Sequence, residues 1–421
     1  MTRVATYLQD LTTLITRYSD VRGLTEELAA PLSPEDQTVQ SMPDVSPTKW
    51  HRAHTTWFFE TFLLEPSLPG YGAFDPHYAY LFNSYYESLG SRYPRPSRGL
   101  LSRPSAREIG VYRQFVDEAM DRLISGAGTE SLVELIEIGI NHEQQHQELL
   151  LMDIKHVLSQ NVPQPAYGSR FEPSLFPDTR SSAQSPRIEH DGGLLDIGNT
   201  GIEFTFDNEL PRHTTYLLPF SIDARPVTCS DWIEFIADGG YSRAELWFSD
   251  GWATCQQQAW EAPLYWYLED GSWHYYTLQG SRKVRGTEPV CHVSYYEADA
   301  FARWKGARLP SEAEWEVVAD SEPVTGNFLD TSVLHPQPVG DRSSMFGDVW
   351  QWTSSPYSAY PGFEPASGAV GEYNGKFMVN QYVLRGGCCV TPPGHIRSTY
   401  RNFFPPSARW PFTGLRLAHD S

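Results

Sequence analysis

Apolar residues recur every three to four positions through most of the first 160 residues, a spacing that predicts amphipathic helices. The predicted helices cover residues 3–18, a second stretch that ends near Ala30, and residues 48–64, 107–124 and 132–158. Ser46 and Pro47 provide a capping residue and a proline before the helix that begins at Thr48. Helices in this order favour an antiparallel four-helix bundle, a scaffold that builds metal sites from facing side chains.

Two irregular stretches separate these helices from one another and from the rest of the chain. Residues 65–105 form a long loop that is rich in tyrosine, proline, glycine and arginine. A loop of that length is usually functional or disordered, and the eight tyrosine and phenylalanine residues in this one favour order. Residues 161–186 are rich in proline and serine, so they predict a linker to a second domain.

After the linker the sequence reads as short strands separated by turns. Segments such as GLLDIG, IEFTFDNE, HTTYLLPFSID and YVLRGG are typical of strands. Helical spacing returns at residues 229–238, 294–305 and 311–319. We therefore expect two domains: a helical bundle over residues 1–160 and an α+β domain over residues 187–421.

Composition and charge exclude several classes of function. The 421 residues carry a formal net charge of −20, which argues against binding to nucleic acid or to anionic membranes. The chain has no uninterrupted apolar run of about 18 residues, and its N-terminus lacks the pattern of a secretory signal. The five cysteines have no regular spacing. We expect a cytoplasmic protein with reduced thiols.

His142 and His146 lie four residues apart in the helix predicted over residues 132–158. Side chains at this spacing share one face of a helix, so both imidazoles can reach a single metal ion. The apolar stripe of the helix includes His142, which directs the pair inward. For an isolated HxxxH motif, a pair of hydrogen-bonded core histidines is about as common as a metal site.

A third ligand is expected from the helix over residues 48–64. That helix carries His51 and His54, and its inward stripe of Trp50, His54 and Trp57 favours His54 as the ligand. His51 lies one position away from the stripe, and we assign it a structural role. Three neutral imidazoles with open positions suit zinc, iron, nickel or copper.

Longer motifs then connect both halves of the chain to known families. The HxxxH motif with its upstream histidine resembles the DinB-like helical bundle. The segments DNELPRHTTYLLPFSID, FGDVWQWTSSPY and YVLRGG resemble the formylglycine-generating-enzyme fold, a C-type-lectin-like domain. Together with PTKWHRAHTTWFFETFLL, FNSYYESLG and RPSRGLLSRP, they make nearly the whole chain similar to the ergothioneine-biosynthesis sulfoxide synthases.

This resemblance implies a reaction and a cofactor. In that family, non-haem Fe(II) and O2 couple a thiol to C2 of the imidazole of hercynine, which is Nα-trimethylated histidine. The sulfur emerges as a sulfoxide, and no further reductant is needed because the two substrates supply the four electrons. The resemblance places the iron ligands at His54, His142 and His146.

The resemblance also implies residues that bind substrate or transfer protons. Tyr85 and Tyr86 match a tyrosine pair that supplies a proton donor near the iron. Arg95 and Arg98 match positions that hold the carboxylate of the thiol substrate, a task that suits planar guanidinium groups.

Three further residues are expected to contact hercynine. Gln145 lies on the ligand face of its helix and is assigned to the substrate carboxylate, together with Asn402. Phe403 is expected to face the trimethylammonium group, a cation–π contact of roughly 0.5–2 kcal/mol. Because Gln145 and Asn402 come from different halves of the sequence, the resemblance implies an active site formed by both.

The segment after Asn402 bears on the thiol donor. Family members that use γ-glutamylcysteine carry an aspartate directly after the Asn-aromatic pair and an arginine four residues later. This chain has Phe404 and Ala408 at those positions, with Arg409 one residue beyond. The missing polar groups favour free cysteine as the donor.

Several alternatives differ in class. A selenoneine synthase or an ovothiol-type sulfoxide synthase would use related chemistry on other substrates. A metal-dependent thiol transferase would use the DinB-like bundle alone. Formylglycine generation requires a separated cysteine pair, which adjacent Cys388 and Cys389 do not provide. A lectin-like binding module would leave three inward histidines without a role.

Overall fold

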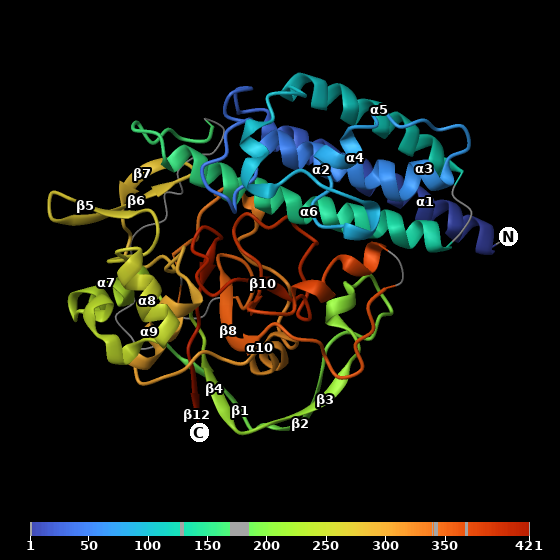
Figure 1. Cartoon of the computed structure of the whole chain (residues 1–421). Coiled ribbons are helices and arrows are strands. Elements are labelled where there is room, and N and C mark those ends of the chain that lie inside the picture. The colour runs from blue at the N-terminus through green and yellow to red at the C-terminus, as the bar shows by residue number, and fades with distance from the viewer. Residues whose placement is uncertain are drawn as a thin grey trace. The chain divides into compact units, whose positions relative to one another are not determined.

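The computed structural model describes residues 2–126, 130–168, 185–338, 340, 344–366 and 369–420 (Figure 1). The chain divides into two compact units. Unit 1 comprises Met1–Pro163 together with Gly368–Glu372, and unit 2 comprises Gln164–Ser367 together with Tyr373–Ser421. Most of the linker expected over residues 161–186 lies outside the described residues, which omit 169–184.

Unit 1 is built on four long helices. They are α1 (Thr2–Ala29), α2 (Thr48–Phe59), α5 (Ala106–Ser125) and α6 (Glu130–Ser159). Helix α2 packs against both α5 and α6, and α1 packs against the same two helices. The helical class expected for this half of the chain is confirmed.

The first helix differs from the prediction. The sequence pattern indicated a helix over residues 3–18 and a separate stretch to Ala30, whereas α1 is continuous through Gly23. A glycine inside a helix costs about 1 kcal/mol relative to alanine but does not end it. Helix α1 is held directly beside that point, because the buried Arg22 pairs with Asp117 on α5 and Glu143 on α6.

The expected loop over residues 65–105 contains short helical turns. Helix α2 continues into a π-helix, η1 (Glu60–Leu64), and then α3 (Glu65–Ser67). Beyond these lie α4 (Tyr78–Leu81), η2 (Glu87–Leu89) and η3 (Arg95–Leu100).

One short segment of unit 1 comes from far along the chain. Residues Ala369–Glu372 form the turn η8, which packs on η2. Both carboxylate oxygens of Glu372 accept backbone hydrogen bonds, from the N–H groups of Glu87 and Ser88, each at 3.0 Å. The turn that follows Tyr85 and Tyr86 is therefore held by a residue nearly 300 positions later.

Unit 2 is an α+β fold with several small sheets. The first sheet joins β1 (Arg187–His190), β4 (Phe220–Asp223) and β12 (Ala418–Asp420). A second has the order β10 (Asn402–Phe404), β9 (Tyr382–Arg385), β8 (Trp350–Pro356) and β11 (Thr413–Gly414), with β11 parallel to β8. A two-stranded sheet joins β2 (Gly193–Ile197) to β3 (His213–Leu217), and a three-stranded sheet has the order β5 (Trp266–Glu269), β6 (Ser272–Thr277) and β7 (Gly280–Lys283).

The helices of unit 2 begin where their capping residues predict. Helices α7 (Cys229–Ala237), α9 (Tyr295–Trp304) and α10 (Glu312–Ala319) each start with a reciprocal capping box. Helix α8 (Ser249–Gln257) has no side-chain cap and was not predicted. All five cysteines are buried and carry free thiols. Among the described residues, no helix is both long and apolar enough to cross a bilayer.

Candidate metal centre

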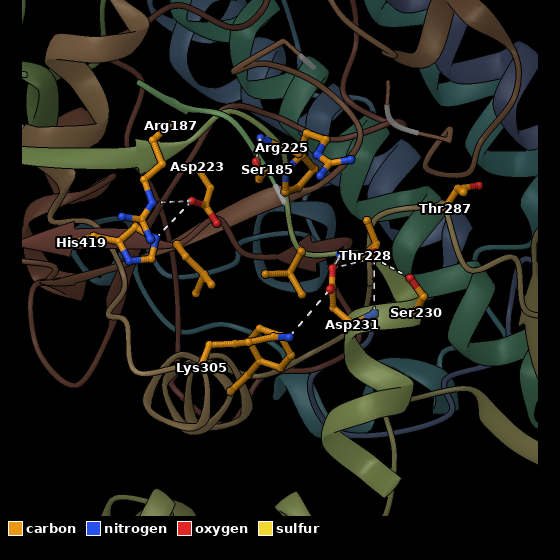
Figure 2. A pocket seen from close by; sticks show the side chains of 14 residues that line it. Ser185, Arg187, Asp223, Arg225, Thr228, Ser230, Asp231, Thr287, Lys305 and His419 are labelled. Atoms are coloured by element: carbon orange, nitrogen blue, oxygen red, sulfur yellow. Dashed lines mark hydrogen bonds and ion pairs between the residues drawn. The ribbon is translucent and has the colours of Figure 1, made fainter. Parts of the chain in front are cut away.

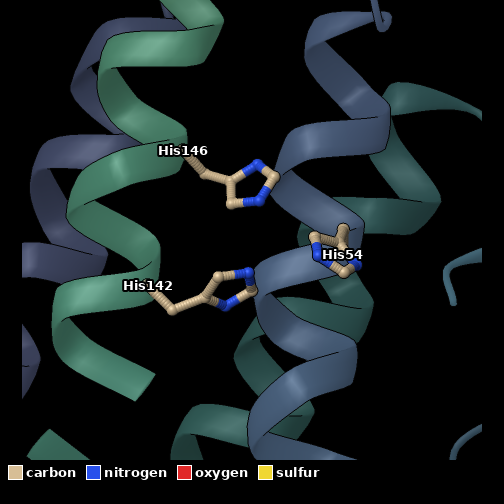
Figure 3. A group of neighbouring side chains, drawn as sticks. All are labelled: His54, His142 and His146. Carbon is tan, nitrogen blue, oxygen red and sulfur yellow. The ribbon is translucent and has the colours of Figure 1, made fainter. Parts of the chain in front are cut away.

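Three imidazoles converge inside the helical bundle of unit 1. His142 and His146 project from successive turns of α6 toward His54 on α2 (Figure 3). One ring nitrogen of each histidine lies within 4.8 Å of the corresponding atoms of the other two. The i, i+4 spacing on α6 and the packing of α2 against α6 produce this arrangement. The group contains His54 and not His51.

The hydrogen bond of His54 leaves one nitrogen available for a metal. Its Nδ1 lies 2.6 Å from the carbonyl oxygen of Phe82, which can only accept, so Nδ1 carries the proton. In the neutral ring, Nε2 then has an exposed lone pair. This buried Nε2 has no hydrogen-bond partner among the described residues. A metal ion would satisfy it, as expected for a ligand whose other nitrogen is held by the protein.

His146 is held by a second histidine. Its Nδ1 lies 2.8 Å from Nδ1 of His51, and Nε2 of His51 lies 3.0 Å from Oδ2 of Asp153. The same carboxylate oxygen accepts the backbone N–H of Ser46 at 2.8 Å. His51 therefore contacts both His146 and Asp153, two partners that could not be identified from the sequence.

Burial keeps the three imidazoles in the form that binds metals. It lowers the pKa of His142 to about 3, and it lowers the pKa of His54 and His146 well below the ordinary value, with the neighbouring histidines adding to the effect. Neutral imidazole is the ligand form, so no proton competes with a metal at neutral pH. Three neutral nitrogen donors fit zinc or a divalent transition metal such as iron.

Aromatic rings surround the ligands. Trp50 stacks on His54 with ring centroids 4.6 Å apart, and Trp57 stacks on the same imidazole at 5.5 Å. Phe58 lies 4.8 Å from the ring of His142. These apolar walls limit water around the three histidines and strengthen electrostatic interactions there.

Arg98 brings an uncompensated positive charge next to this group. Its side chain is buried, and its guanidinium carbon lies 3.3 Å from the ring centroid of Trp50. Its hydrogen bonds go to the hydroxyls of Ser46 and Ser84, at 2.9 and 3.3 Å, and no carboxylate of the described residues forms an ion pair with it. Burial, together with the nearby charge of Arg95, lowers the pKa of Arg98, because removal from water disfavours the charged form.

Two expectations change with this geometry. Ser46 does not cap α2: Pro47 occupies the N-cap position, and the Ser46 hydroxyl accepts from Arg98 instead. Arg95, expected to act together with Arg98, is exposed and donates to the carbonyl oxygen of Asp44 at 2.5 Å. The structure therefore distinguishes the two arginines, which the sequence motif treats alike.

The two tyrosines lie close to the aromatic wall. Tyr86 is fully buried, and its ring stacks on that of Tyr85 at 4.7 Å. Tyr86 also lies 5.7 Å from the ring of Trp57, which itself stacks on His54. Asn83 exchanges two hydrogen bonds with the backbone of Tyr86, each 3.0 Å, and so fixes the loop.

Gln145 is half-buried on α6, one residue before His146 and three after His142. Its position places it next to the ligand face of the helix.

The remaining expected substrate contacts lie in unit 2. Asn402 and Phe403 are adjacent in β10, so their side chains leave opposite faces of the sheet. Phe403 stacks on Tyr357 at 4.0 Å and near Phe377 at 5.8 Å. Asn402 is half-buried, and its Oδ1 accepts the backbone N–H of Phe403 at 2.9 Å.

Unit 2 also contains a pocket of about 300 Å³ between β4, α7 and α9 (Figure 2). Its charges form pairs: Asp223 contacts Arg187 and His419, and Asp231 lies 4.0 Å from Lys305. The carboxylate of Asp231 also caps α7. These pairs give the pocket no strong preference for one ligand charge.

Family models match both units. Residues 17–150 match the DinB superfamily, and residues 175–341 and 332–421 match the sulfatase-modifying factor enzyme 1-like domain. The two matches confirm the fold class expected from the sequence, a helical bundle followed by a domain of the formylglycine-generating-enzyme type.

Relatives with curated names match nearly the whole length. The hercynine oxygenase of Mycolicibacterium thermoresistibile is 31% identical over 414 residues, covering 90% of this chain and 88% of that protein. The hercynine oxygenase of Mycobacterium tuberculosis is 32% identical over 415 residues, covering 90% and 92%. Ergothioneine biosynthesis protein 1 of Schizosaccharomyces pombe is 26% identical over 232 residues, covering 52% of this chain and 28% of that protein. With three clustered histidines that can bind a metal and this full-length similarity, the chain belongs to the hercynine oxygenase family.

Proposed function

We propose that this protein is a non-haem iron(II)- and O2-dependent sulfoxide synthase of ergothioneine biosynthesis, which joins the sulfur of cysteine to C2 of the hercynine imidazole. The observation that carries the proposal is the group of three clustered, neutral imidazoles, two of them fully buried, in a chain of the hercynine oxygenase family. The overall reaction balances without another reductant. The imidazole C–H, the thiol S–H and O2 become the C–S bond, the S=O group and one water.

His54, His142 and His146 would hold the iron. The orphaned Nε2 of His54 and the low pKa of all three rings fit a divalent metal with three nitrogen ligands. Bound Fe(II) supplies one-electron chemistry and O2 activation, with positions left open for substrates. The chain's own groups provide binding, orientation and protons.

Arg98 would bind the carboxylate of the thiol substrate. A buried guanidinium without an ion pair is costly, and a substrate carboxylate would satisfy it in a bidentate geometry. Gln145, beside the ligand face, would hydrogen-bond the carboxylate of hercynine. Arg95, exposed and tied to a backbone carbonyl, would contribute long-range attraction at most.

Tyr85 and Tyr86 would deliver a proton to the oxygen that leaves as water. A phenol is neutral at pH 7, so its Oη can donate. Tyr86 is buried, and its ring contacts that of Trp57, which itself stacks on His54.

Free cysteine is the proposed donor. The polar groups that would hold a glutamyl moiety are replaced by Phe404 and by Ala408, which is buried. Arg409 does not substitute for them, because it pairs with the buried Glu297 at 3.0 Å and lies over the ring of Trp260.

The test is anaerobic reconstitution with Fe(II), followed by O2 with hercynine and one of three donors: cysteine, γ-glutamylcysteine or a selenosugar. Mass spectrometry should show the cysteine sulfoxide of hercynine as the main product. A fourth arm with histidine in place of hercynine tests the ovothiol-type reaction. His142→Ala is the matched control, which should bind little iron and form no product. Product with γ-glutamylcysteine or the selenosugar alone would overturn the donor assignment. Iron-loaded protein that is inactive in all arms would overturn the reaction.

A further inference from the structure

His51 connects a carboxylate to a candidate metal ligand. It is 3% exposed and lies between two residues of α6, with Nε2 3.0 Å from Oδ2 of Asp153 and Nδ1 2.8 Å from Nδ1 of His146. The two Nδ1 atoms are at hydrogen-bond distance, so one of them must donate and the other must accept. Which one donates decides where the lone pair of His146 points.

The surroundings of Asp153 determine the donor. Its Oδ2 accepts the backbone N–H of Ser46 as well as the contact with His51, so this oxygen acts as an acceptor. His51 must therefore carry its proton on Nε2, and in the neutral ring its Nδ1 is an acceptor. Nδ1 of His146 then carries a proton and donates it to His51, which leaves Nε2 of His146 with the exposed lone pair.

We infer that Asp153 and His51 are positioning residues that fix His146 in the tautomer with its Nε2 lone pair directed at the metal. The inference rests on the proposed metal site and concerns residues outside the ligand set. A carboxylate behind a ligand histidine orients the ring and raises its basicity. Here the carboxylate acts through an intervening imidazole, whereas His54 is oriented by the backbone carbonyl of Phe82.

The alternative tautomer would block the site. If His146 carried its proton on Nε2, that nitrogen could not bind a metal until the ring changed tautomer or rotated. The ring is held between α6 and the side chains of His51 and Trp50, which limits rotation. Loss of the hydrogen bond from His51 should therefore weaken metal binding without removing a ligand, and 10- to 100-fold is typical for such partners.

Two substitutions of His51 each remove one of its two contacts, that with Asp153 or that with His146. Asparagine places its amide oxygen where Nδ1 of histidine lies, so His51→Asn retains the acceptor for His146 but cannot reach Asp153. Glutamine reaches the position of Nε2, so His51→Gln can still contact Asp153 but offers no acceptor to His146. His156→Asn on α6 is the control, because His156 bonds the hydroxyl of Ser41 and does not belong to the candidate ligand group.

The full-length protein is titrated with Co(II) against a chelating indicator, and the visible spectrum of the bound Co(II) is recorded. We expect His51→Gln to bind Co(II) about 10- to 100-fold more weakly than the wild type. His51→Asn should stay within about threefold of the wild type, as should His156→Asn. In the metal-free protein, ¹⁵N chemical shifts of His146 should report one tautomer in the wild type and in His51→Asn, and a mixture in His51→Gln. Circular dichroism and thermal unfolding confirm that each variant is folded.

The outcomes separate this inference from the proposed function. Equal Co(II) affinity in His51→Asn and His51→Gln, or an unchanged tautomer of His146 in His51→Gln, overturns the positioning role. A wild-type protein that binds no Co(II) overturns the metal site itself. Neither measurement depends on turnover or on the identity of the thiol.

Discussion

The guanidinium carbon of Arg98 lies over the indole of Trp50, 3.3 Å from its ring centroid, and Trp50 in turn stacks on His54. The cation–π contact offsets part of the cost of burying Arg98, but it leaves the donors of the guanidinium without a carboxylate. The positive charge is thus held in place before any substrate arrives.

Replacing Arg98 by glutamine should raise the KM for cysteine by about 10- to 100-fold, the range expected when a charge-assisted hydrogen bond to a carboxylate is lost. The KM for hercynine should change much less. Arg95→Gln is the matched control and should leave both values within about threefold. Steady-state kinetics with each substrate varied in turn provides the measurement, and equal effects of the two substitutions would contradict the distinction between a buried and an exposed arginine.

Replacing Tyr85 and Tyr86 together by phenylalanine removes two hydroxyls and keeps the aromatic volume. Iron and hercynine binding should persist, while C–S coupling should fall by about 10²- to 10⁴-fold because a proton donor is lost. Part of the thiol should instead be oxidised without coupling. Product analysis of the double variant and of each single variant identifies the donor, with Tyr80→Phe, at an exposed position of α4, as the control. Unchanged sulfoxide yield in the double variant would show that both rings serve packing and that neither hydroxyl takes part in the reaction.

Replacing Glu372 by glutamine removes the charge of the carboxylate that accepts hydrogen bonds from the backbone N–H groups of Glu87 and Ser88. We expect turnover to fall roughly 10-fold, since a charge-assisted pair of hydrogen bonds positions the turn after the tyrosines. Metal affinity should be unchanged because no ligand is touched. Glu364→Gln, at an exposed position of unit 2, is the control. Iron loss in Glu372→Gln would indicate general unfolding of unit 1 instead.

Substitutions of Asn402 and Phe403 should have different effects, the first on the KM for hercynine and the second on stability. Asn402→Ala should raise the KM for hercynine about 10-fold, as expected for one lost hydrogen bond to a carboxylate. Phe403→Leu should mainly lower the midpoint of thermal unfolding, because the ring stacks on Tyr357. A raised KM for hercynine in Phe403→Leu would instead support a direct contact with the trimethylammonium group.

Glu288 should make the stability of unit 2 sensitive to acid. Burial opposes its ionisation, but His335 and Arg282 outweigh burial and lower the pKa of Glu288 to about 2. Since the folded-state pKa is depressed, the stabilisation is fully present above about pH 4.5 and is lost as the pH falls toward 2. Glu288→Gln should reduce the free energy of unfolding at pH 7 by about 3–5 kcal/mol, the usual result of removing one partner of a buried pair.

Urea unfolding at several pH values tests this expectation. The difference between wild type and Glu288→Gln should shrink as the pH falls from 4.5 to 2. Glu269→Gln is the control, because that carboxylate is exposed and lies 3.6 Å from His274. A difference that stays constant over this pH range would show that the charge of Glu288 is not what stabilises the fold.

Local patterns predicted much of this structure. The spacing of His142 and His146 and the stripe that contains His54 depend only on helix periodicity, and the capped helices α9 and α10 begin at their serine caps. The predicted division of the first helix was wrong: α1 continues through Gly23, because packing against α5 and α6 outweighs the low helix propensity of glycine.

The interactions that link distant parts of the chain could not be predicted in the same way. The pairing of His51 with Asp153 spans 102 positions, and no local pattern marks either residue. An RxxR motif in a loop does not reveal that Arg98 is buried and Arg95 exposed, because burial depends on where the loop packs. The anchoring role of Glu372 could not be predicted either, because it depends on a contact with the backbone of Glu87, 285 positions earlier.

The short return of the chain at η8 makes unit 1 discontinuous. A fragment that ends at Pro163 contains every candidate ligand but lacks Glu372, so its tyrosine turn has lost an anchor even if its four helices fold. Separating the two halves of the gene would therefore not yield two independent modules. A helical half with an anchored tyrosine turn would need that short segment supplied again, as a grafted loop or an added peptide.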